Sequence, residues 1–407
     1  MSWLRGSPSG QLRLLHPLRA MASSLRGLRL QGQGMAAVAQ PVGAWVGSRV
    51  ALAGFVLTAS WLVGIDKARL ASDPGMWLLQ RFTYWDSLHF LRIAEQGYFP
   101  PHLACCDQAF FPGYPLLVAG VAPLTGGTMV AALVVSLLAG IGSAVLLWRL
   151  AADTGGRRMA ACAVLFLIVA PYGIFLSAAY SESTFLVFVL AAWLAGTKRH
   201  WWWAGIFAGA AAGVRVNGLF LALALAVMYV AQLRSQGRWR PRWDAAALLV
   251  PFAVTGAYFA YLFASTGSLD AWHRAEAAGW RRQTVWPWQA FSAAWHAIVS
   301  TSKPDLVLSR WADLLTVVAG VVLVLVLTAL RRWPEVVYVG LSVGVLLCSN
   351  MFTSAPRYAL VWFPGYLVAA QLATRPGWNW LRVAIPALCL PLTFALALAF
   401  SARQWVS

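Results

Sequence analysis

Residues 129–147 read MVAALVVSLLAGIGSAVLL, a run without a single charged side chain. A helix of about 20 apolar residues crosses the roughly 30 Å hydrocarbon core of a bilayer. Similar runs recur along the chain, and 60% of its 407 residues are hydrophobic while only 11% are charged. Soluble domains carry about 25% charged residues. The composition therefore excludes a soluble domain and predicts one all-α polytopic membrane domain.

We expect about eleven transmembrane helices, within a range of about eight to twelve, in a single domain over residues 49–401. The expected spans are 49–65, 129–147, 159–177, 184–195, two short helices within 201–233, 245–264, 314–330, 335–347, 358–373 and 383–400. Long polar loops are expected at about 66–110 and 265–310, and a short tail at 402–407. Residues 110–124 are apolar but short and rich in proline, which favours a re-entrant or interfacial segment.

The net charge of +18 comes from 31 Lys and Arg against 13 Asp and Glu. The basic residues lie in short loops between the apolar runs rather than in one patch, which argues against nucleic-acid binding. With the amino terminus on the cytoplasmic side, five basic clusters all fall on that side: 149–158, 198–200, 234–242, 331–332 and 375–382. The two long loops then lie on the outer side. This orientation requires residues 201–233 to cross twice.

Residues 1–48 carry several arginines and no acidic residue, and are rich in Ser and Gly. We expect a disordered basic tail. An organelle-targeting leader and a later true start, at Met21 or Met35, remain open.

Five cysteines are present, and none has the spacing of a zinc site. Three of them lie in apolar runs, where they serve as small packing residues: Cys162, Cys348 and Cys389. Cys105 and Cys106 are adjacent in the first long loop, so a vicinal disulfide remains open.

Polar residues at membrane depth are costly and mark functional sites. Asp86 and His89 lie one helical turn apart, so they share a face with Phe90. They could bind or deprotonate a hydroxyl. A plain N-cap role for Asp86 is the alternative.

The second polar site is Glu182, between two apolar helices, where the carboxylate either faces water or lies buried in a site. The third is Arg215, inside an apolar run, which is suited to bind a phosphate. The alternative for Arg215 is a salt bridge to Glu182. Arg357, at the outer end of a late helix, is either a second phosphate ligand or an interfacial arginine.

The loop 265–310 is rich in Trp and Arg. This pattern is typical of helices lying flat in a lipid interface. A role in clamping a lipid-linked substrate is the alternative.

Four stretches together resemble the GPI mannosyltransferase II (PIG-V type) family. They are WDSLHFLRIAEQGY at 85–98 followed by AFFPGYPL at 109–116, AAYSES at 178–183, GVRVNGL at 213–219 and WFP at 362–364. The sequence departs from the family pattern at Val216, where the family has Ser. It also has shorter loops and no Asn-x-Ser/Thr site, which favours a bacterial relative.

The resemblance implies a GT-C type, inverting glycosyltransferase that needs no cofactor or metal. It implies a polyprenyl- or dolichyl-phosphate-mannose donor and a lipid-linked or glycolipid acceptor. The site would face the non-cytoplasmic side, of the endoplasmic reticulum membrane in a eukaryote or the plasma membrane in a bacterium. It implies Asp86 as the catalytic base. The expected substrate-binding residues are Trp85, His89, Tyr180, Glu182, Arg215, Asn217 and Arg357.

Two other functions remain open. One is a transporter or flippase of lipid-linked sugars, which would use the same polar residues as a pathway. No inverted repeat is evident in the hydropathy, and the polar residues gather on one side rather than at the midplane. The other is a non-catalytic partner of another transferase.

Overall fold

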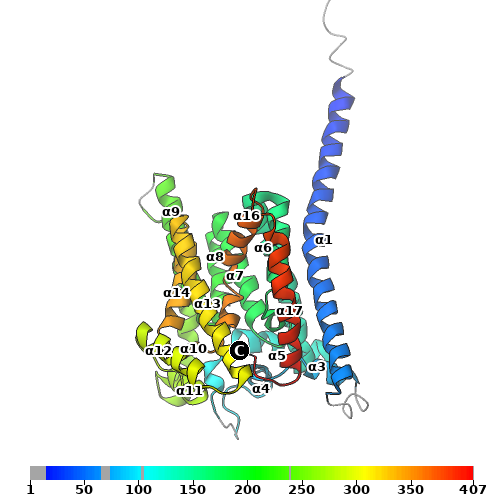
Figure 1. Ribbon diagram of the computed structural model, residues 1–407. Coiled ribbons are helices and arrows are strands. Elements are labelled where there is room, and N and C mark those ends of the chain that lie inside the picture. The colour runs from blue at the N-terminus through cyan, green and yellow to red at the C-terminus, as the bar shows by residue number, and fades with distance from the viewer. Residues whose placement is uncertain (1–14, 66–73, 102–104, 238–239, 407) are drawn as a thin grey trace, which may run out of the picture.

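The computed structural model describes residues 15–65, 74–101, 105–237 and 240–406 (Figure 1). Over these residues the chain is helical, with a single isolated bridge between Thr284 and Ser349. The all-α prediction is confirmed. The first part of the chain forms α1 (Leu15–Val63), α3 (Pro74–Gln80), α4 (Asp86–Gln96), the 3-10 turn η1 (Asp107–Ala109), α5 (Gly113–Thr125), α6 (Thr128–Ile168), η2 (Gly173–Leu176), α7 (Glu182–Thr197), α8 (Trp201–Val214) and α9 (Gly218–Ser235).

The second part forms η3 (Trp243–Leu249), α10 (Val250–Thr266), α11 (Ala271–Trp280), α12 (Pro287–Ser300), α13 (Pro304–Ala329), α14 (Trp333–Leu347), α15 (Ala355–Ala359), α16 (Phe363–Ala373) and α17 (Leu381–Ser401). The long helices run side by side, whereas α4, α11 and α12 lie at one end of the bundle (Figure 1).

Six helical segments among the described residues are long and apolar enough to cross a membrane, so this is a multi-pass membrane protein. They are Val38–Val63, α6, α9, Trp243–Thr266, Leu306–Ala329 and α17. Four further apolar helices, α5, α7, α14 and α16, have 11 to 16 residues and are shorter than a bilayer needs. The expected count of about eleven is therefore not confirmed.

Glycines set two of the helix boundaries. Within α6, Gly155 and Gly156 leave helical geometry, and Gly156 has a φ of +75°. This kink separates the two spans expected at 129–147 and 159–177. Helices α8 and α9 separate at 215–217, as predicted. A Cβ on Gly218 would lie 2.2 Å from the backbone nitrogen of Ala212, so only glycine lets α9 start this close to α8.

The first helix differs from the prediction, which began it at Arg49. Helix α1 begins at Leu15, within the segment expected as a tail, and residues 1–14 lie outside the described residues. Arg49 is buried inside α1 and donates to the carbonyl of Gly173 at 2.9 Å and to Ser177 Oγ at 2.8 Å. A third donation reaches the carbonyl of Ile168, at the end of α6, at 3.2 Å. Terminal carbonyls of a helix lack partners within it, so a buried arginine is satisfied here without reaching the membrane surface.

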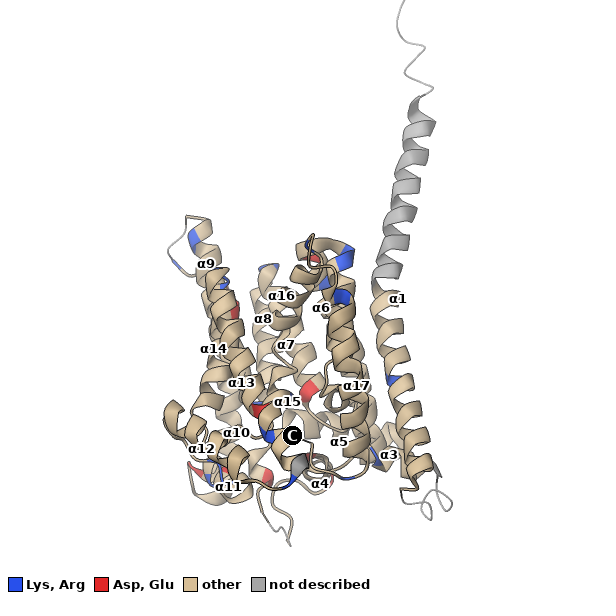
Figure 2. Cartoon of the chain, viewed as in Figure 1, with Lys and Arg blue, Asp and Glu red and all other residues tan. Residues whose placement is uncertain are grey.

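Many of the charged residues lie toward the two ends of the bundle (Figure 2). Arginines and lysines lie at the end where α9 finishes and α6 kinks. Acidic and basic residues both occur toward the other end, near α11 and α15. The second end holds the candidate site.

Candidate active site

Four of the predicted residues meet in one ion-pair network. Arg357 Nη1 donates to Asp86 Oδ2 at 2.8 Å, and its Nη2 donates to Glu182 Oε1 at 2.9 Å. The same Glu182 oxygen accepts from Arg215 Nη1 at 2.9 Å. Two carboxylates thus balance two guanidinium groups in a space where Glu182 is fully buried. Removing one member would leave a buried charge unpaired, at a cost of several kcal/mol, so the four residues depend on one another.

The first residue of α4 is Asp86, and the N-cap position before it is occupied by Trp85. The Asp86 side chain is 16% exposed and lines a pocket at the end of the bundle. The helix amino terminus stabilises a carboxylate at this position. The plain N-cap alternative is therefore wrong, because Trp85 holds that position, and the Asp86 side chain is partly exposed to the pocket.

Arg215 occupies the break between α8 and α9, in extended backbone. Its guanidinium lines the same pocket, is 16% exposed and lies 5.3 Å from the centre of the Tyr358 ring. Ser181 Oγ accepts a hydrogen bond from it at 3.3 Å. A Cβ on Gly113 would lie 2.7 Å from the Gly213 carbonyl, so α5 packs directly against the turn that carries Arg215. The salt bridge to Glu182, left open from the sequence, is present.

Arg357 lies deeper in the site. It is 9% exposed, and its guanidinium carbon lies 4.7 Å from the ring centres of both Phe175 and Tyr180. Tyr180 is itself buried and donates to the backbone carbonyl of Tyr84 at 2.9 Å. Tyr180 thus packs against Arg357 and connects the AAYSES stretch to the start of α4, but it is not among the residues that line the pocket.

The remaining predicted residues are spread around the site. Asn217 lines the pocket at the start of α9. Trp85 is 38% exposed and packs edge-on against Trp405, whose ring also lines the pocket. His89 is not among the residues that line the pocket, and its ring contacts Asp107 and stacks on Phe110.

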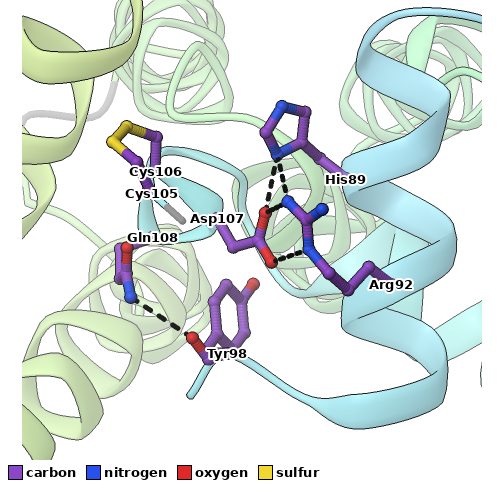
Figure 3. Close-up of a disulfide and its surroundings, with 7 residues drawn as sticks. All are labelled: His89, Arg92, Tyr98, Cys105, Cys106, Asp107 and Gln108. Atoms are coloured by element: carbon purple, nitrogen blue, oxygen red, sulfur yellow. Dashed lines mark hydrogen bonds and ion pairs between the residues drawn. A yellow bond between two sulfur atoms is a disulfide. The ribbon is translucent and has the colours of Figure 1, made fainter. Parts of the chain in front are cut away.

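Asp107 anchors the loop that follows α4. Figure 3 shows its carboxylate between His89 and Arg92, with the disulfide of Cys105 and Cys106 beside it. His89 Nδ1 lies 2.6 Å from Asp107 Oδ1, and Arg92 Nε donates to Oδ2 at 2.8 Å. Burial alone would raise the pKa of Asp107, but hydrogen bonds from Arg92 and His89 bring it below the ordinary value. The cluster ties this loop to the helix that presents Asp86.

We expect Asp107→Asn to destabilise the protein by about 1–3 kcal/mol at neutral pH, because it weakens a buried, charge-assisted contact. The folded-state pKa of Asp107 is depressed, so its stabilisation is complete at neutral pH and fades only as pH falls below the ordinary aspartate range. Thermal unfolding in detergent at pH 7 measures the loss. Glu95→Gln, an exposed carboxylate on the same helix, is the control. An Asp107→Asn protein as stable as the control would contradict this role.

Several pocket residues were not among the predicted site residues. They are Trp272, Glu276, Trp280, Arg282 and Tyr358. Arg282 donates to the Tyr358 hydroxyl at 3.0 Å. The density of Trp and Arg in 265–310 was the available signal. Among the described residues, no group of three or more His, Cys, Asp or Glu side chains is placed to hold a metal ion.

Part of this chain is similar to known proteins. Residues 72–236 match the family model described as Mannosyltransferase (PIG-V). GPI alpha-1,6-mannosyltransferase 2 of Mus musculus is 37% identical over 153 residues, which cover 35% of this chain and 30% of that protein. GPI mannosyltransferase 2 of Chaetomium globosum is 30% identical over 190 residues, covering 38% of this chain and 40% of that protein.

The matches thus span less than half the length of these relatives. Among solved structures, the apo oligosaccharyltransferase of Archaeoglobus fulgidus aligns with a TM-score of 0.44 and 15% identity, over 80% of this chain and 52% of that chain. The family resemblance predicted from the sequence is confirmed: the segment from residue 72 to 236, which carries Asp86, Glu182 and Arg215, matches the mannosyltransferase (PIG-V) family.

Proposed function

We propose that this protein is an inverting, membrane-embedded mannosyltransferase with a GT-C type architecture. Its donor is a polyprenyl- or dolichyl-phosphate-mannose, and its acceptor is a lipid-linked glycan or glycolipid. The observation that carries the proposal is the single pocket in which residues of three family-matching motifs, Asp86, Ser181 and Arg215, stand together with Arg357.

In the proposed reaction, an acceptor hydroxyl attacks the anomeric carbon of the donor mannose. A new carbon–oxygen bond forms on one face while the bond to the phosphate oxygen breaks on the other, which inverts the anomeric centre. Asp86 takes the hydroxyl proton as general base. The polyprenyl phosphate leaves with the electron pair, and its charge is stabilised by Arg215.

The two arginines have different tasks in this proposal. Arg215 lines the pocket and shares Glu182 with Arg357, so it can turn toward a phosphate while Glu182 stays paired. Arg357 holds Asp86 at 2.8 Å and lies on two aromatic rings, so it positions the base. Bidentate contact with phosphate oxygens is the chemistry for which a guanidinium is suited.

A membrane assay tests the donor and the reaction together. Membranes containing the protein are incubated with polyprenyl-phosphate mannose labelled in the sugar, and separately with labelled GDP-mannose. We expect label in a lipid-extractable glycan from the first donor alone. The Asp86→Asn protein at equal abundance is the control. Transfer from GDP-mannose only, after polyprenyl-phosphate mannose synthesis is blocked, would exclude the proposed donor.

We further propose that the site faces the non-cytoplasmic side of the membrane, in the endoplasmic reticulum if the host is eukaryotic and at the plasma membrane if it is bacterial. The support is the gathering of basic clusters at the end of the bundle opposite the pocket (Figure 2).

Single cysteines at Arg240 and Trp286, in a background without the native cysteines, test this orientation. We expect an impermeant maleimide added to sealed vesicles of known orientation to label only position 286 from the non-cytoplasmic side, and position 240 only after permeabilisation. Both positions are exposed in the folded protein, so access to reagent depends on the membrane. Labelling of position 240 from the non-cytoplasmic side would contradict the proposed orientation in the membrane.

A further inference from the structure

Helix α11 presents one face to the pocket. Trp272, Glu276 and Trp280 are spaced four residues apart, which places them on a common helix face. All three line the pocket. On the other side of the helix, His273 and Arg274 are exposed. This segment was expected to lie in the lipid interface or, alternatively, to clamp a lipid-linked substrate, and its helix α11 contributes three residues to the pocket wall.

Both indole rings are fixed by the loop that follows the disulfide. Trp272 Nε1 donates to the carbonyl of Ala109 at 3.1 Å. Trp280 packs edge-on against Phe110 at a centroid distance of 5.3 Å. The helix itself packs closely on this loop, since a Cβ on Gly279 would lie 3.1 Å from Cys106 Cβ. The rings are thus preorganised, which reduces the entropy lost when a ligand binds.

Glu276 stands between the two rings with a side chain 19% exposed. Its nearest cation is Arg282, whose Nε lies 3.7 Å from Oε2, beyond hydrogen-bond distance. Arg282 is itself engaged with the Tyr358 hydroxyl. Burial raises the pKa of Glu276, and Arg282 opposes that shift only in part. Because Arg282 lies beyond hydrogen-bond distance and Glu276 lines the pocket, its carboxylate oxygens can accept hydrogen bonds from a ligand there.

We propose that this face of α11 binds the hexose ring of the acceptor that receives the transferred sugar. This inference rests on the proposed function and deepens it. Indole faces pack against the C–H face of a pyranose, and the carboxylate accepts hydrogen bonds from two sugar hydroxyls. A preformed pocket with aromatic walls and one convergent charged group is the usual form of a small-ligand site.

The acceptor, rather than the donor, suits this face. A donor sugar is attached to an anionic phosphodiester, which the carboxylate of Glu276 would repel, whereas the acceptor ring carries hydroxyls. The acceptor must also reach Asp86, which lines the same pocket. The negative charge of Asp86 also raises the pKa of Glu276, in addition to the larger effect of burial. The two carboxylates therefore face a shared volume in which a polyol can bridge them.

Steady-state kinetics of Trp280→Ala and Glu276→Gln tests the assignment. We expect KM for the acceptor to rise about tenfold or more in each, since each change removes a stacking surface or a charge-assisted hydrogen bond. KM for polyprenyl-phosphate mannose should stay within about twofold of wild type. Trp288→Ala on α12, where the side chain is 65% exposed, and Glu335→Gln, paired with Arg332 on α14, are the matched controls. A rise in donor KM with unchanged acceptor KM would overturn the acceptor assignment.

A binding measurement separates this inference from the proposed function. Purified protein is titrated with tritium-labelled octyl α-mannoside, α-glucoside and α-galactoside, without donor. We expect saturable binding of at least one glycoside, weakened about tenfold or more in both α11 variants and retained in both controls. Absence of such binding in the wild type, or equal binding in the α11 variants, would overturn the inference. Failure of the wild type to transfer mannose, with α11-dependent binding intact, would instead overturn the proposed function.

Discussion

Asp86→Asn should nearly abolish mannosyl transfer, with a loss of about 10²–10⁴-fold in kcat. The amide keeps the size of the side chain, and its oxygen can still accept a hydrogen bond from Arg357. In the wild-type protein, Arg357 Nη1 lies 2.8 Å from Asp86 Oδ2. It cannot take up the proton of the attacking hydroxyl. Donor binding, measured with labelled polyprenyl-phosphate mannose, should remain close to that of wild type.

His89→Ala is the informative comparison for this variant. His89 contacts Asp107 rather than the pocket, so we expect a smaller loss of activity together with a lower unfolding temperature. A turnover near the wild-type value in Asp86→Asn would remove Asp86 as base. Glu182 would be a poor replacement, because it is fully buried and paired with Arg215 and Arg357.

Arg215→Ala should weaken donor binding by about tenfold or more while the protein still folds. The side chain lines the pocket, and Glu182 keeps its two contacts with Arg357 when Arg215 is removed. Charge-assisted hydrogen bonds to a phosphate contribute about 1.5–3 kcal/mol each, which sets the expected loss in affinity. Equilibrium binding of labelled polyprenyl-phosphate mannose and thermal unfolding are measured on the same preparation.

Arg357→Ala provides the contrast. It leaves Asp86 without its cation and Glu182 with one partner fewer, and breaking a buried ion pair typically costs about 3–5 kcal/mol. We therefore expect Arg357→Ala to lower the unfolding temperature far more than Arg215→Ala does. Unchanged donor affinity together with a large drop in unfolding temperature in Arg215→Ala would make Arg215 structural only.

The helical membrane fold follows from the sequence because runs such as 129–147 carry almost no polar side chains and are long enough to lie in lipid. In lipid, a helix satisfies its backbone hydrogen bonds internally. The positions of the helix ends were predicted less accurately. Arg49 was taken as a membrane boundary, but it lies within α1 because carbonyls of α6 and η2 accept its hydrogen bonds. Such partners lie more than 100 residues away in the chain, and local hydropathy carries no information about them.

The same limit applies to the site. The motifs identify Asp86, Glu182, Arg215 and Arg357 one by one, yet the pairing of Arg357 with Asp86 spans 271 residues. The sequence left two alternative roles open for Arg215 and two for Arg357. In the structure both arginines pair with the carboxylate of Glu182. In α11 the spacing of Trp272, Glu276 and Trp280 was visible, but whether that face meets lipid or a pocket depends on where the loop at 105–110 folds.

The most direct test of the proposed activity uses the purified protein alone, reconstituted in liposomes with labelled polyprenyl-phosphate mannose and a glycolipid extract as acceptor. Purification removes any other transferase, so this measurement separates an enzyme from a non-catalytic partner. We predict label in a glycolipid product with wild-type protein and almost none with Asp86→Asn. Wild-type protein that binds the donor but forms no labelled product with any fraction of the extract would contradict the account.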